Sequence, residues 1–493
     1  SIIIISGALK IDQNIANKSQ GYFVRKNIEQ ANEAGKLGYI KFEVNDYAEV
    51  FGVKWTWKPG MDRMRIIRSG PEDFDDIGYI SLLQLIAIAG KKITITFVEK
   101  LHNYSFIISA GILSFIIAKF YKNILAGWIF LILVLLLKSR ILSLIYGSPD
   151  SRTFVILFPM VTMGIIIGLN WLRNYSNNLW RLSFVLLFGA LAGMMALIRS
   201  SEGMAVFYTI LFSIAVLKLG IKQKAIAITI LLAGYFLITI VTPITFALHR
   251  DIKTNEFNGD ISLYLQTTGR HPAWHSIVAG IGKYSNSIDM KYDDKQVYAI
   301  LRSRYQDAMD PVYNFHGKGY FPGLQEIYFD YITKYPLEYN KNILKAYAEL
   351  FYFLPYGLSV GNLSWNYGFL PVKSGIKVND RDLPFPGSLI NLRYKYLRLT
   401  LIDWGIYIFA VLAIFFVIRQ VFFTKMERNN KNIILSISFY MFLLATQRAI
   451  IPQHGLSLIV GFWIFAIMSL LYICFTNSTV KAFLFLRLRS FNV

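Results

Sequence analysis

Long runs of apolar residues, each about the length of a membrane-crossing helix, dominate the pattern of this chain. They alternate with short polar breaks and with one long polar segment. A helix needs about 20 predominantly apolar residues to cross a hydrocarbon core about 30 Å thick, so each run predicts one transmembrane helix. The predicted spans are residues 104–121, 124–146, 153–172, 181–198, 204–219, 225–248, 401–419, 432–447 and 456–475.

The chain opens with SIIIISGALK, whose apolar stretch is too short to cross a bilayer. We interpret it as the end of a first transmembrane helix rather than as a cleaved signal peptide, because the basic region that starts a signal peptide is not seen. The pattern as a whole predicts an all-α polytopic membrane protein with about 10 spans, the first of them incomplete.

Basic residues concentrate in alternate connections between the predicted spans. Short loops rich in lysine and arginine belong on the cytoplasmic side, which predicts a multi-pass protein of the inner or plasma membrane. The opposite, extracytoplasmic face then carries residues 9–103, 147–152, 199–203, 249–400 and 448–455. The basic residues assigned to the cytoplasmic face are Lys119, Lys122, Arg173, Arg181, Lys218, Lys222, Lys224, Arg419, Lys425, Arg428, Lys431, Lys481, Arg487 and Arg489.

Three parts of the chain follow from this topology. Residues 1–248 form an N-terminal transmembrane module with its first extracytoplasmic loop at 9–103. Residues 249–400 form an extracytoplasmic domain that the pattern predicts to be mainly helical, and residues 401–493 hold the last spans and a cytoplasmic tail. Within 77–103, IGYISLLQLIAIA and ITFVEKLHNY predict two short amphipathic helices in the membrane interface, separated by a GKK break.

Composition agrees with a membrane protein and excludes other classes. Hydrophobic residues make up 55% of the chain and charged residues 16%, against about 25% charged in soluble domains. The net charge of +21 fits cytoplasmic loops and anionic lipid head groups, and no nucleic-acid-binding motif accompanies it. The single cysteine, Cys474, excludes an intramolecular disulfide and a multi-cysteine metal site, and we interpret it as a packing residue.

Four acidic residues crowd into the first extracytoplasmic loop, in the sequence GPEDFDDIGYISLLQL. Carboxylates this close repel one another and raise each other's pKa unless a cation or a reacting group uses them. One interpretation is therefore a catalytic or cation-binding cluster, and the other is a solvated acidic turn that caps the helix after it. The four residues are Glu72, Asp73, Asp75 and Asp76.

A second acidic position lies between two spans on the same face. Asp150 in YGSPDSRTF is followed two residues later by Arg152. Asp150 can act as a helix N-cap or can join the acidic cluster of the first loop in binding a substrate.

Two arginines end spans on the extracytoplasmic face, where the positive-inside rule makes them unexpected. Arg199 is followed by Glu202, and the two can form a local ion pair or Arg199 can bind a phosphate through its fork of donors. Arg448 is followed by His454 across a proline turn. It can snorkel to the interface, or the two can bind a lipid-linked phosphate.

The long extracytoplasmic segment contains TGRHPAWHSIVAGIGKYSN. His271 and His275 are four residues apart, but Pro272 stands where a zinc protease of the H-E-x-x-H type has its glutamate, which argues against that class. Arg270, His271, Trp274 and His275 predict an acceptor site in which Trp274 stacks on a sugar. The alternative is an aromatic-rich element of the fold.

These features together resemble the GT-C glycosyltransferases, which include protein O-mannosyltransferases and lipid A aminoarabinose transferases. The stretch DDIGY, from Asp75 to Tyr79, is similar to the first-loop D-(D/E)-x-x-Y pattern of that group, and SPDSRTFVILFP is similar to its second-loop region. The resemblance implies a membrane enzyme that moves a sugar from a polyprenyl-phosphate carrier to a protein, lipid or glycan acceptor outside the cytoplasm.

The resemblance also implies roles for individual residues. Asp75 is the expected general base on the acceptor hydroxyl, and Asp76 is expected to bind the acceptor or a metal. A phosphate leaving group needs little acid help, so one carboxylate suffices for an inverting displacement, while arginine donors stabilise the departing phosphate. Arg448, Arg199 and His454 are the candidates for the lipid phosphate. A divalent cation (Mg, Mn or Ca) has candidate oxygen ligands in Asp75, Asp76 and Asp150.

Other interpretations stay open at this stage. The extra acids Glu72 and Asp73 allow the base to lie two or three positions away from Asp75. A glycan ligase or polymerase of the O-antigen type would also use extracytoplasmic arginines and a large loop. A lipid or glycan transporter would use ionisable groups along a membrane pathway, and a structural subunit would use none of them chemically.

Overall fold

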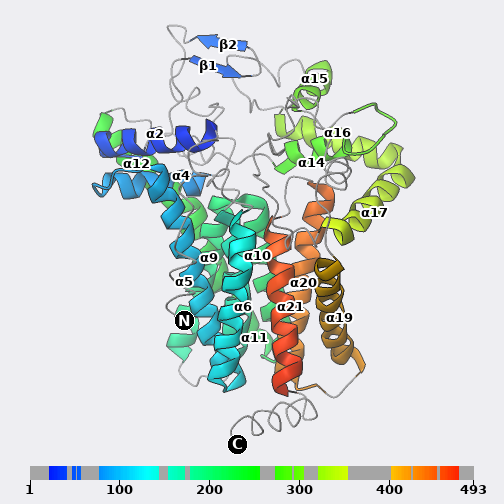
Figure 1. The fold of residues 1–493 in the computed structure, drawn as a ribbon. Coiled ribbons are helices and arrows are strands. Elements are labelled where there is room, and N and C mark those ends of the chain that lie inside the picture. Colours follow the sequence, from blue (N-terminus) through cyan, green and yellow to red (C-terminus); the bar gives the residue numbers. More distant parts are fainter. Residues whose placement is uncertain are drawn as a thin grey trace, which may run out of the picture.

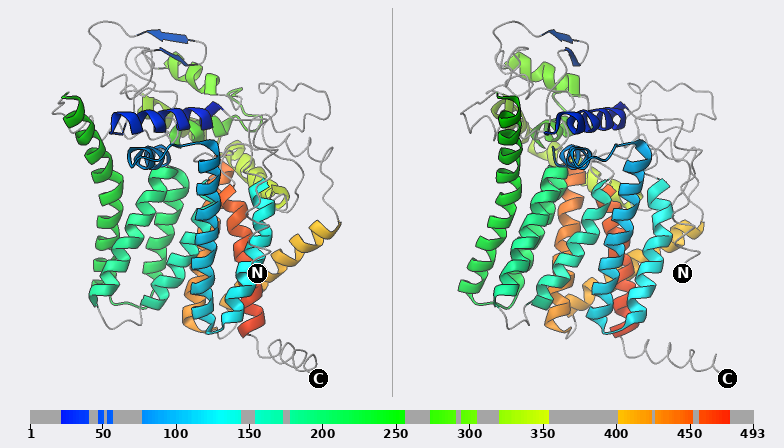
Figure 2. Two further views of the ribbon diagram at one scale, coloured as in Figure 1. Left: turned by 60° about the vertical axis from the view of Figure 1, so that its left-hand side comes forward. Right: turned by 90° about the vertical axis from the view of Figure 1, so that its left-hand side faces the viewer.

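The computed structural model describes residues 22–40, 47–50, 53–56, 77–143, 154–172, 178–255, 273–290, 294–304, 320–353, 401–423, 426–451 and 456–476. Within these ranges the chain is almost entirely helical, and the helices form a bundle with further helices gathered at one end (Figures 1 and 2). We call that end, which is uppermost in Figure 1, the upper end of the bundle and the opposite one its lower end.

A helix lies at each predicted span from residue 104 onward, which confirms an all-α membrane protein, while the incomplete first span predicted at the start of the chain lies outside the described residues. The described part of the chain has 6 helices long and apolar enough to cross a membrane, whereas α6, α8 and α10 have shorter apolar stretches. The bundle helices are α5 (Ile95–Tyr121), α6 (Ile124–Ser143), α8 (Phe158–Leu172), α9 (Asn178–Ile198), α10 (Ser200–Val216), α11 (Ile221–Phe236), α12 (Thr242–Thr254), α19 (Leu401–Phe423), α20 (Arg428–Ile450) and α21 (Leu456–Thr476). A short 3₁₀ turn, η1 (Val155–Leu157), leads into α8, and a π-helical turn, η2 (Leu237–Val241), joins α11 to α12.

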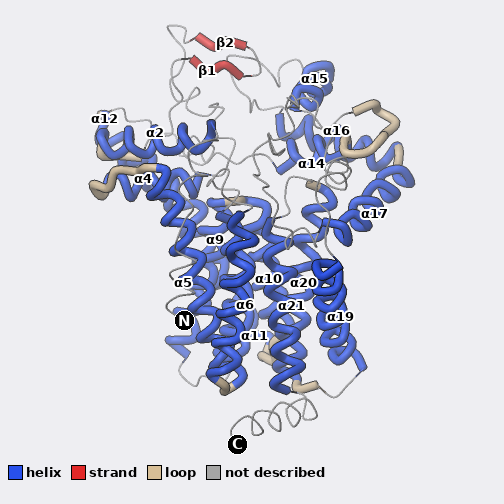
Figure 3. The backbone as a smooth tube through the Cα atoms, in the orientation of Figure 1, coloured by secondary structure: helices blue, strands red, loops and turns tan. Residues whose placement is uncertain are grey.

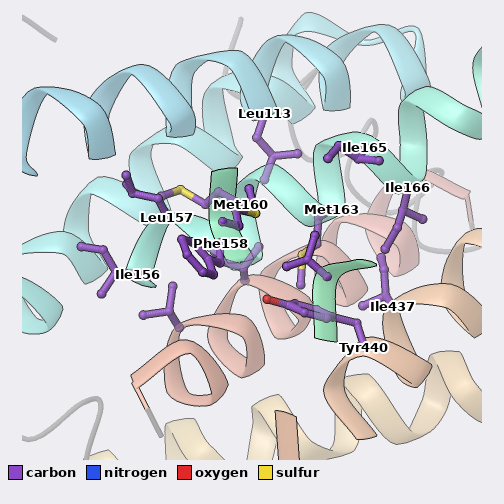
Figure 4. Close-up of a cluster of buried hydrophobic side chains, with 14 of the residues drawn as sticks. Leu113, Ile156, Leu157, Phe158, Met160, Met163, Ile165, Ile166, Ile437 and Tyr440 are labelled. Carbon is purple, nitrogen blue, oxygen red and sulfur yellow. The ribbon is translucent and has the colours of Figure 1, made fainter. Parts of the chain in front are cut away.

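Helix α8 forms the centre of the bundle. Its side chains are buried nearly all round, and Figure 4 shows Met160 and Met163 among side chains from other helices, including Leu113 of α5 and Tyr440 of α20. A helix that is apolar on every side belongs in such a position. Helix α19 lies at the edge instead, where Phe409 and other apolar side chains remain exposed in the way expected of a surface that faces lipid.

The lower end carries several of the basic residues that the sequence placed together. There α5 ends at Tyr121 and is followed by its C-cap Lys122, which has a left-handed backbone. Lys218 lies in the turn from α10 to α11, and Lys222 and Lys224 lie in the first turn of α11. Lys224 donates its ammonium group to the carbonyl oxygen of Ala215 at the end of α10. Cations near the C-terminus of a helix are stabilised by the carbonyl groups that have no partner within the helix.

Two helices lie across the upper end, α2 (Tyr22–Leu37) above α4 (Ile77–Ile88) (Figures 1 and 2). The Asn32 side chain of α2 exchanges two hydrogen bonds of 2.8 Å with the backbone of Ile93, just before α5. Helix α4 is covered by α2 on one side and by the end of α9 on another. It is therefore a packed helix with apolar residues on several sides, and not the amphipathic helix that the sequence predicted.

The prediction of a second short helix within residues 77–103 is wrong. ITFVEKLHNY forms the first turns of α5, which continues without a break to Tyr121. Thr94 caps its start, because the Thr94 hydroxyl accepts a hydrogen bond of 3.1 Å from the Phe97 amide. No glycine or proline interrupts the sequence before the long apolar run, so the helix has no reason to end at residue 103.

Four further helices pack together above the bundle: α14 (Ala273–Ile281), α15 (Asp294–Arg304), α16 (Tyr320–Lys334) and α17 (Pro336–Phe353). They share a small core that includes Val278, Val297 and Leu324. The predicted segment 249–400 is thus helical where the structure describes it. Helix α17 also reaches the bundle, since the Tyr347 hydroxyl lies 2.6 Å from that of Thr446 on α20.

The sequence did not predict one small element. Strands β1 (Tyr47–Val50) and β2 (Val53–Thr56) pair as an antiparallel hairpin, with Tyr47 opposite Thr56. The hairpin lies above the other elements at the upper end, and Figure 3 shows it as the only strand structure among the residues described there.

Candidate functional site

A single residue, Arg199, separates α9 from α10 at the upper end. Its backbone is extended, with φ −157° and ψ 103°, so the chain reverses direction there with almost no loop. The two helices approach closely because Gly203 has no side chain. A Cβ at that position would lie 2.2 Å from the Ala196 backbone nitrogen. The glycine therefore makes this tight reversal possible and determines where Arg199 stands.

Arg199 and Glu202 are both buried, with 7% and 4% of their surfaces exposed. The Arg199 Nε lies 3.7 Å from Oε2 of Glu202, which confirms the local ion pair that the spacing allowed. The Ser201 hydroxyl donates a hydrogen bond of 2.6 Å to the same carboxylate oxygen. Buried charges need such partners, because the protein interior replaces little of the hydration they lose.

The end of α20 meets the start of α10. Gln447 of α20 donates its side-chain amide to the backbone carbonyl of Ser201, across 246 positions of sequence. Arg448 follows directly and is only 5% exposed. A snorkelling arginine keeps its head group in water, so this burial argues against that interpretation. The fold thus brings the two arginines that the sequence singled out to one junction between helices.

The first-loop and second-loop motifs also meet. Tyr79 ends the DDIGY stretch, Phe154 belongs to SPDSRTF, and both pack against His102 of α5. The Tyr79 hydroxyl lies 2.9 Å from Nε2 of His102, and the ring centroids of His102 and Phe154 are 5.0 Å apart. All three side chains are at least nine-tenths buried. We call Tyr79, His102 and Phe154 the aromatic junction.

The start of α4 lies against the α9–α10 reversal. A Cβ on Gly78 would lie 2.6 Å from the carbonyl carbon of Leu197, two residues before Arg199. Ile77, which follows Asp76 in the sequence, is the first residue of α4. The helix that carries the end of the acidic motif therefore contacts the helix that ends beside Arg199.

The start of α21 completes the arrangement. The Ser457 hydroxyl lies 3.5 Å from the carbonyl oxygen of Val155, in the short turn that follows the second-loop motif. Four segments far apart in the sequence, near residues 78, 154, 199 and 447–457, therefore contact one another in pairs at the upper end of the bundle.

Several predicted site residues lie outside the part of the chain that the structure describes. They are Asp75, Asp76, Asp150, Arg152, Arg270, His271 and His454. Among the described residues, no three His, Cys, Asp or Glu side chains are grouped so that they could hold a metal ion. The cation site of Asp75, Asp76 and Asp150 stays a prediction from the sequence.

Trp274 and His275 lie in α14, within the helical unit above the bundle. The Trp274 ring packs 5.8 Å from the rings of Tyr328 and Phe329, and His275 is 4% exposed. This packing of Trp274 and His275 agrees with the alternative interpretation, in which the stretch is an aromatic-rich element of the fold. A cavity of about 20 Å³ lies between this helical unit and the end of α20. The cavity has room for a water molecule but not for a sugar.

Sequence reasoning missed three buried polar residues in the first turns of α5: Glu99, His102 and Asn103. Their spacing places them on one face of the helix, while Lys100 and Tyr104 are exposed. The signal was present in the sequence, since ionisable residues inside a span usually face a bundle interior. It was overlooked because residues 95–103 were interpreted as a separate interfacial helix.

No family model, no curated protein and no solved structure matches this chain. The resemblance to the GT-C glycosyltransferases therefore rests only on the motifs DDIGY and SPDSRTF and on the predicted topology.

Proposed function

We propose that this chain is an integral-membrane glycosyltransferase with a GT-C-like bundle of about 10 spans. It moves a sugar from a polyprenyl-phosphate carrier to an acceptor hydroxyl at the upper end, which faces the periplasm or the exterior. One observation carries the proposal. The described ends of the two loop motifs, Tyr79 and Phe154, meet at His102, at the same end of the bundle where Arg199 and Arg448 are buried.

The proposed reaction is a single displacement with inversion. Asp75 takes the proton from the acceptor hydroxyl as its oxygen bonds to the anomeric carbon of the sugar. The bond from that carbon to the phosphate oxygen breaks, and the lipid phosphate leaves with the electron pair. Asp76 orients the acceptor or, with Asp75 and Asp150, holds a divalent cation. Asp73 is the alternative base if the motif is shifted.

Arginine suits the leaving-group side of this reaction. Negative charge grows on the phosphate as the bond breaks, and guanidinium donors held in a water-poor site stabilise that charge. Arg448 and Arg199 supply such groups at the α10–α20 contact, with His454 as a further donor. The Glu202 carboxylate beside Arg199 holds one guanidinium in place before the substrate arrives.

The aromatic junction has a positioning role in this proposal. It ties α4, which follows the acidic motif, to the segment that follows Asp150 and Arg152. Rigid packing of this kind restricts how far the two loops can separate, and small displacements of a catalytic group cost large factors in rate. Trp274 and His275 are proposed only as packing residues of the neighbouring helical unit. An acceptor role for Arg270 and His271 stays a prediction from the sequence.

The test is transfer from radiolabelled polyprenyl-phosphate sugars by the purified full chain, with Asp75→Asn and Asp76→Asn compared with the unmodified protein. We expect Asp75→Asn to lose at least about 10³-fold in rate while donor binding is kept, because only the proton acceptor is removed. Asp76→Asn is expected to lose less.

Two other outcomes of the transfer assay would change or contradict the proposal. Full activity of Asp75→Asn, with loss in Asp73→Asn or Asp76→Asn, would move the base within the motif. Absence of transfer by the unmodified protein across a broad panel of donors and acceptors would contradict the glycosyltransferase proposal and favour a transporter or a structural subunit.

A further inference from the structure

A basic groove lies at the upper end of α5, on the side that faces away from the aromatic junction. Its volume is about 480 Å³, within the range of small-ligand sites. Lys91, Lys92 and Lys100 line it and are all exposed. Three lysines at this end are unexpected for a face predicted to lie outside the cytoplasm, so they call for an explanation other than topology.

The groove continues downward into an apolar stripe on the same helix. Tyr104 lines the groove and is 50% exposed, and the stripe below it consists of Ile108, Ile112 and Phe115, which are 60%, 58% and 63% exposed. These residues recur every three or four positions, so they lie on one face of α5. From Tyr104 to Phe115 the helix rises about 16 Å, close to half the hydrocarbon thickness of a bilayer.

The two features together have the form of a lipid. Positive charges in a groove at the membrane surface attract a phosphate head group, and a stripe one leaflet long accommodates an acyl chain. Gly111 interrupts the stripe with no heavy atom within 4 Å of its Cβ position, which leaves extra room beside Ile108 and Ile112. We propose that this face of α5 binds an anionic glycerophospholipid, its phosphate on Lys91, Lys92 and Lys100 and one chain along the stripe.

This site is separate from the proposed donor site. Lys100 and Tyr104 point outward, whereas His102 and Asn103 are buried on the opposite face of the same turn. The lipid would steady α5, whose inner face holds the aromatic junction. Binding is a property of the resting protein and needs no sugar transfer, so it can be tested whether or not the chain is a glycosyltransferase.

Site-specific photocrosslinking is the direct test. A p-benzoylphenylalanine replaces Tyr104 in the full chain, which is placed in nanodiscs of equal phosphatidylglycerol and phosphatidylcholine with identical acyl chains. Phe409 is the matched control position, since it is also aromatic, exposed (59%) and near the upper end of its helix, α19. We expect phosphatidylglycerol to exceed phosphatidylcholine about fivefold or more among the adducts at 104, and to show no such excess at 409.

Charge variants separate the groove from general lipid contact. Lys91→Gln, Lys92→Gln and Lys100→Gln combined should abolish the excess at 104, while the same three positions changed to Arg should keep it. All three side chains are exposed, so both variants should fold, which size-exclusion chromatography checks. Equal adducts at 104 and 409, or an excess that survives the Gln changes, would overturn the proposal.

A competition arm distinguishes the two sources of a lipid phosphate. Polyprenyl phosphate is added to the nanodiscs at about one-tenth of the phosphatidylglycerol. If phosphatidylglycerol remains the main lysine-dependent adduct at 104, the glycerophospholipid assignment stands. If polyprenyl phosphate replaces it, the groove belongs to the carrier lipid and the assignment is wrong.

Discussion

Arginine burial at the upper end of the bundle is the feature with the strongest consequence for single residues. Arg199 and Arg448 are each at least nine-tenths buried, at a contact where Gln447 donates to the Ser201 backbone. Arginine presents a planar fork of donors that lysine does not have, so the two are not interchangeable at a phosphate site. The proposed role of these side chains therefore predicts sensitivity even to a change that keeps the charge.

We expect Arg448→Lys to lower kcat/KM for sugar transfer about 100-fold, the usual loss when one preorganised donor to a developing negative charge is removed. The measurement is steady-state transfer from a polyprenyl-phosphate sugar. Arg419→Lys is the control, because Arg419 is exposed near the end of α19 that lies farthest from this site. Equal rates for Arg448→Lys and Arg419→Lys would remove Arg448 from the site.

A second residue-scale prediction concerns the aromatic junction. Tyr79→Phe deletes the hydroxyl that lies 2.9 Å from His102 and leaves a buried imidazole nitrogen without that partner. The expected loss of stability is about 1–2 kcal/mol, which thermal unfolding in detergent should show as a lower midpoint. Tyr208→Phe is the matched control, since Tyr208 is 49% exposed, and it should leave the midpoint unchanged.

At the scale of elements, the reversal between α9 and α10 decides where Arg199 stands. Two helices joined by one residue must begin their packing at once, and the Gly203 backbone rests on the Ala196 backbone with no room for a methyl group. Gly78 makes the same kind of approach between α4 and the end of α9. The site is thus assembled by close helix contacts rather than by long loops.

Gly203→Ala is therefore expected to destabilise the protein by about 1–3 kcal/mol or more, because its Cβ would lie 2.2 Å from the Ala196 nitrogen and the helices would have to part. Thermal unfolding and folded yield are the measurements. Gly111→Ala in α5 is the control, since no atom lies within 4 Å of its Cβ position and alanine favours helix. A tolerated Gly203→Ala would mean that the reversal is not tightly packed.

At the scale of the whole molecule, the helical unit of α14 to α17 is held together at Glu338. Its carboxylate accepts hydrogen bonds from the Ser287 amide at 2.9 Å and from the Tyr331 hydroxyl at 2.7 Å. The hydrogen bond from the Ser287 side chain is the first cause that lowers the pKa of Glu338, followed by the one from Tyr331. Burial is the first cause that raises the pKa of Tyr331, and the hydrogen bond between Tyr331 and Glu338 is the second.

The pKa shift predicts acid sensitivity of this unit. A carboxyl whose pKa is lowered in the folded state contributes stability that is complete above its ordinary value of 4.5 and is lost as pH falls through the lowered value. Since Glu338 lies near the surface, the contribution is about 1 kcal/mol at most. Hydrogen exchange near residues 282–290, corrected for the intrinsic effect of pH, should rise below pH 4.5.

Glu338→Gln should show that faster exchange already at pH 7 and should no longer change between pH 7 and acid. Glu326→Gln is the control, because Glu326 is an exposed residue of α16. Exchange in the Glu338 variant that matches the unmodified protein at every pH would contradict the prediction.

The sequence by itself determined the helices of the bundle and the end to which the unusual residues belong. Apolar runs of membrane length leave the backbone no alternative to helix, since every polar group must be satisfied within the segment. Short basic connections assign the ends, so Arg199 and Arg448 were expected on one face, and Glu202 at i+3 was expected beside Arg199. These are local properties that pattern and spacing express directly.

Tertiary structure decided which of these residues contact one another. These contacts depend on how helices pack across large sequence separations. They are the hydrogen bond from Gln447 to Ser201, the packing of Tyr79 and Phe154 on His102, and the close approach of Gly78 to Leu197. The spacing of apolar residues along a helix does not specify which other helix it will contact. Residues 95–103 differ, because no glycine or proline ends the helix before the long apolar run and they continue into α5. Packing then decides that Glu99, His102 and Asn103 are buried on its inner face. Helix formation is decided by each segment alone, whereas a site made from helix ends exists only once those ends have packed together.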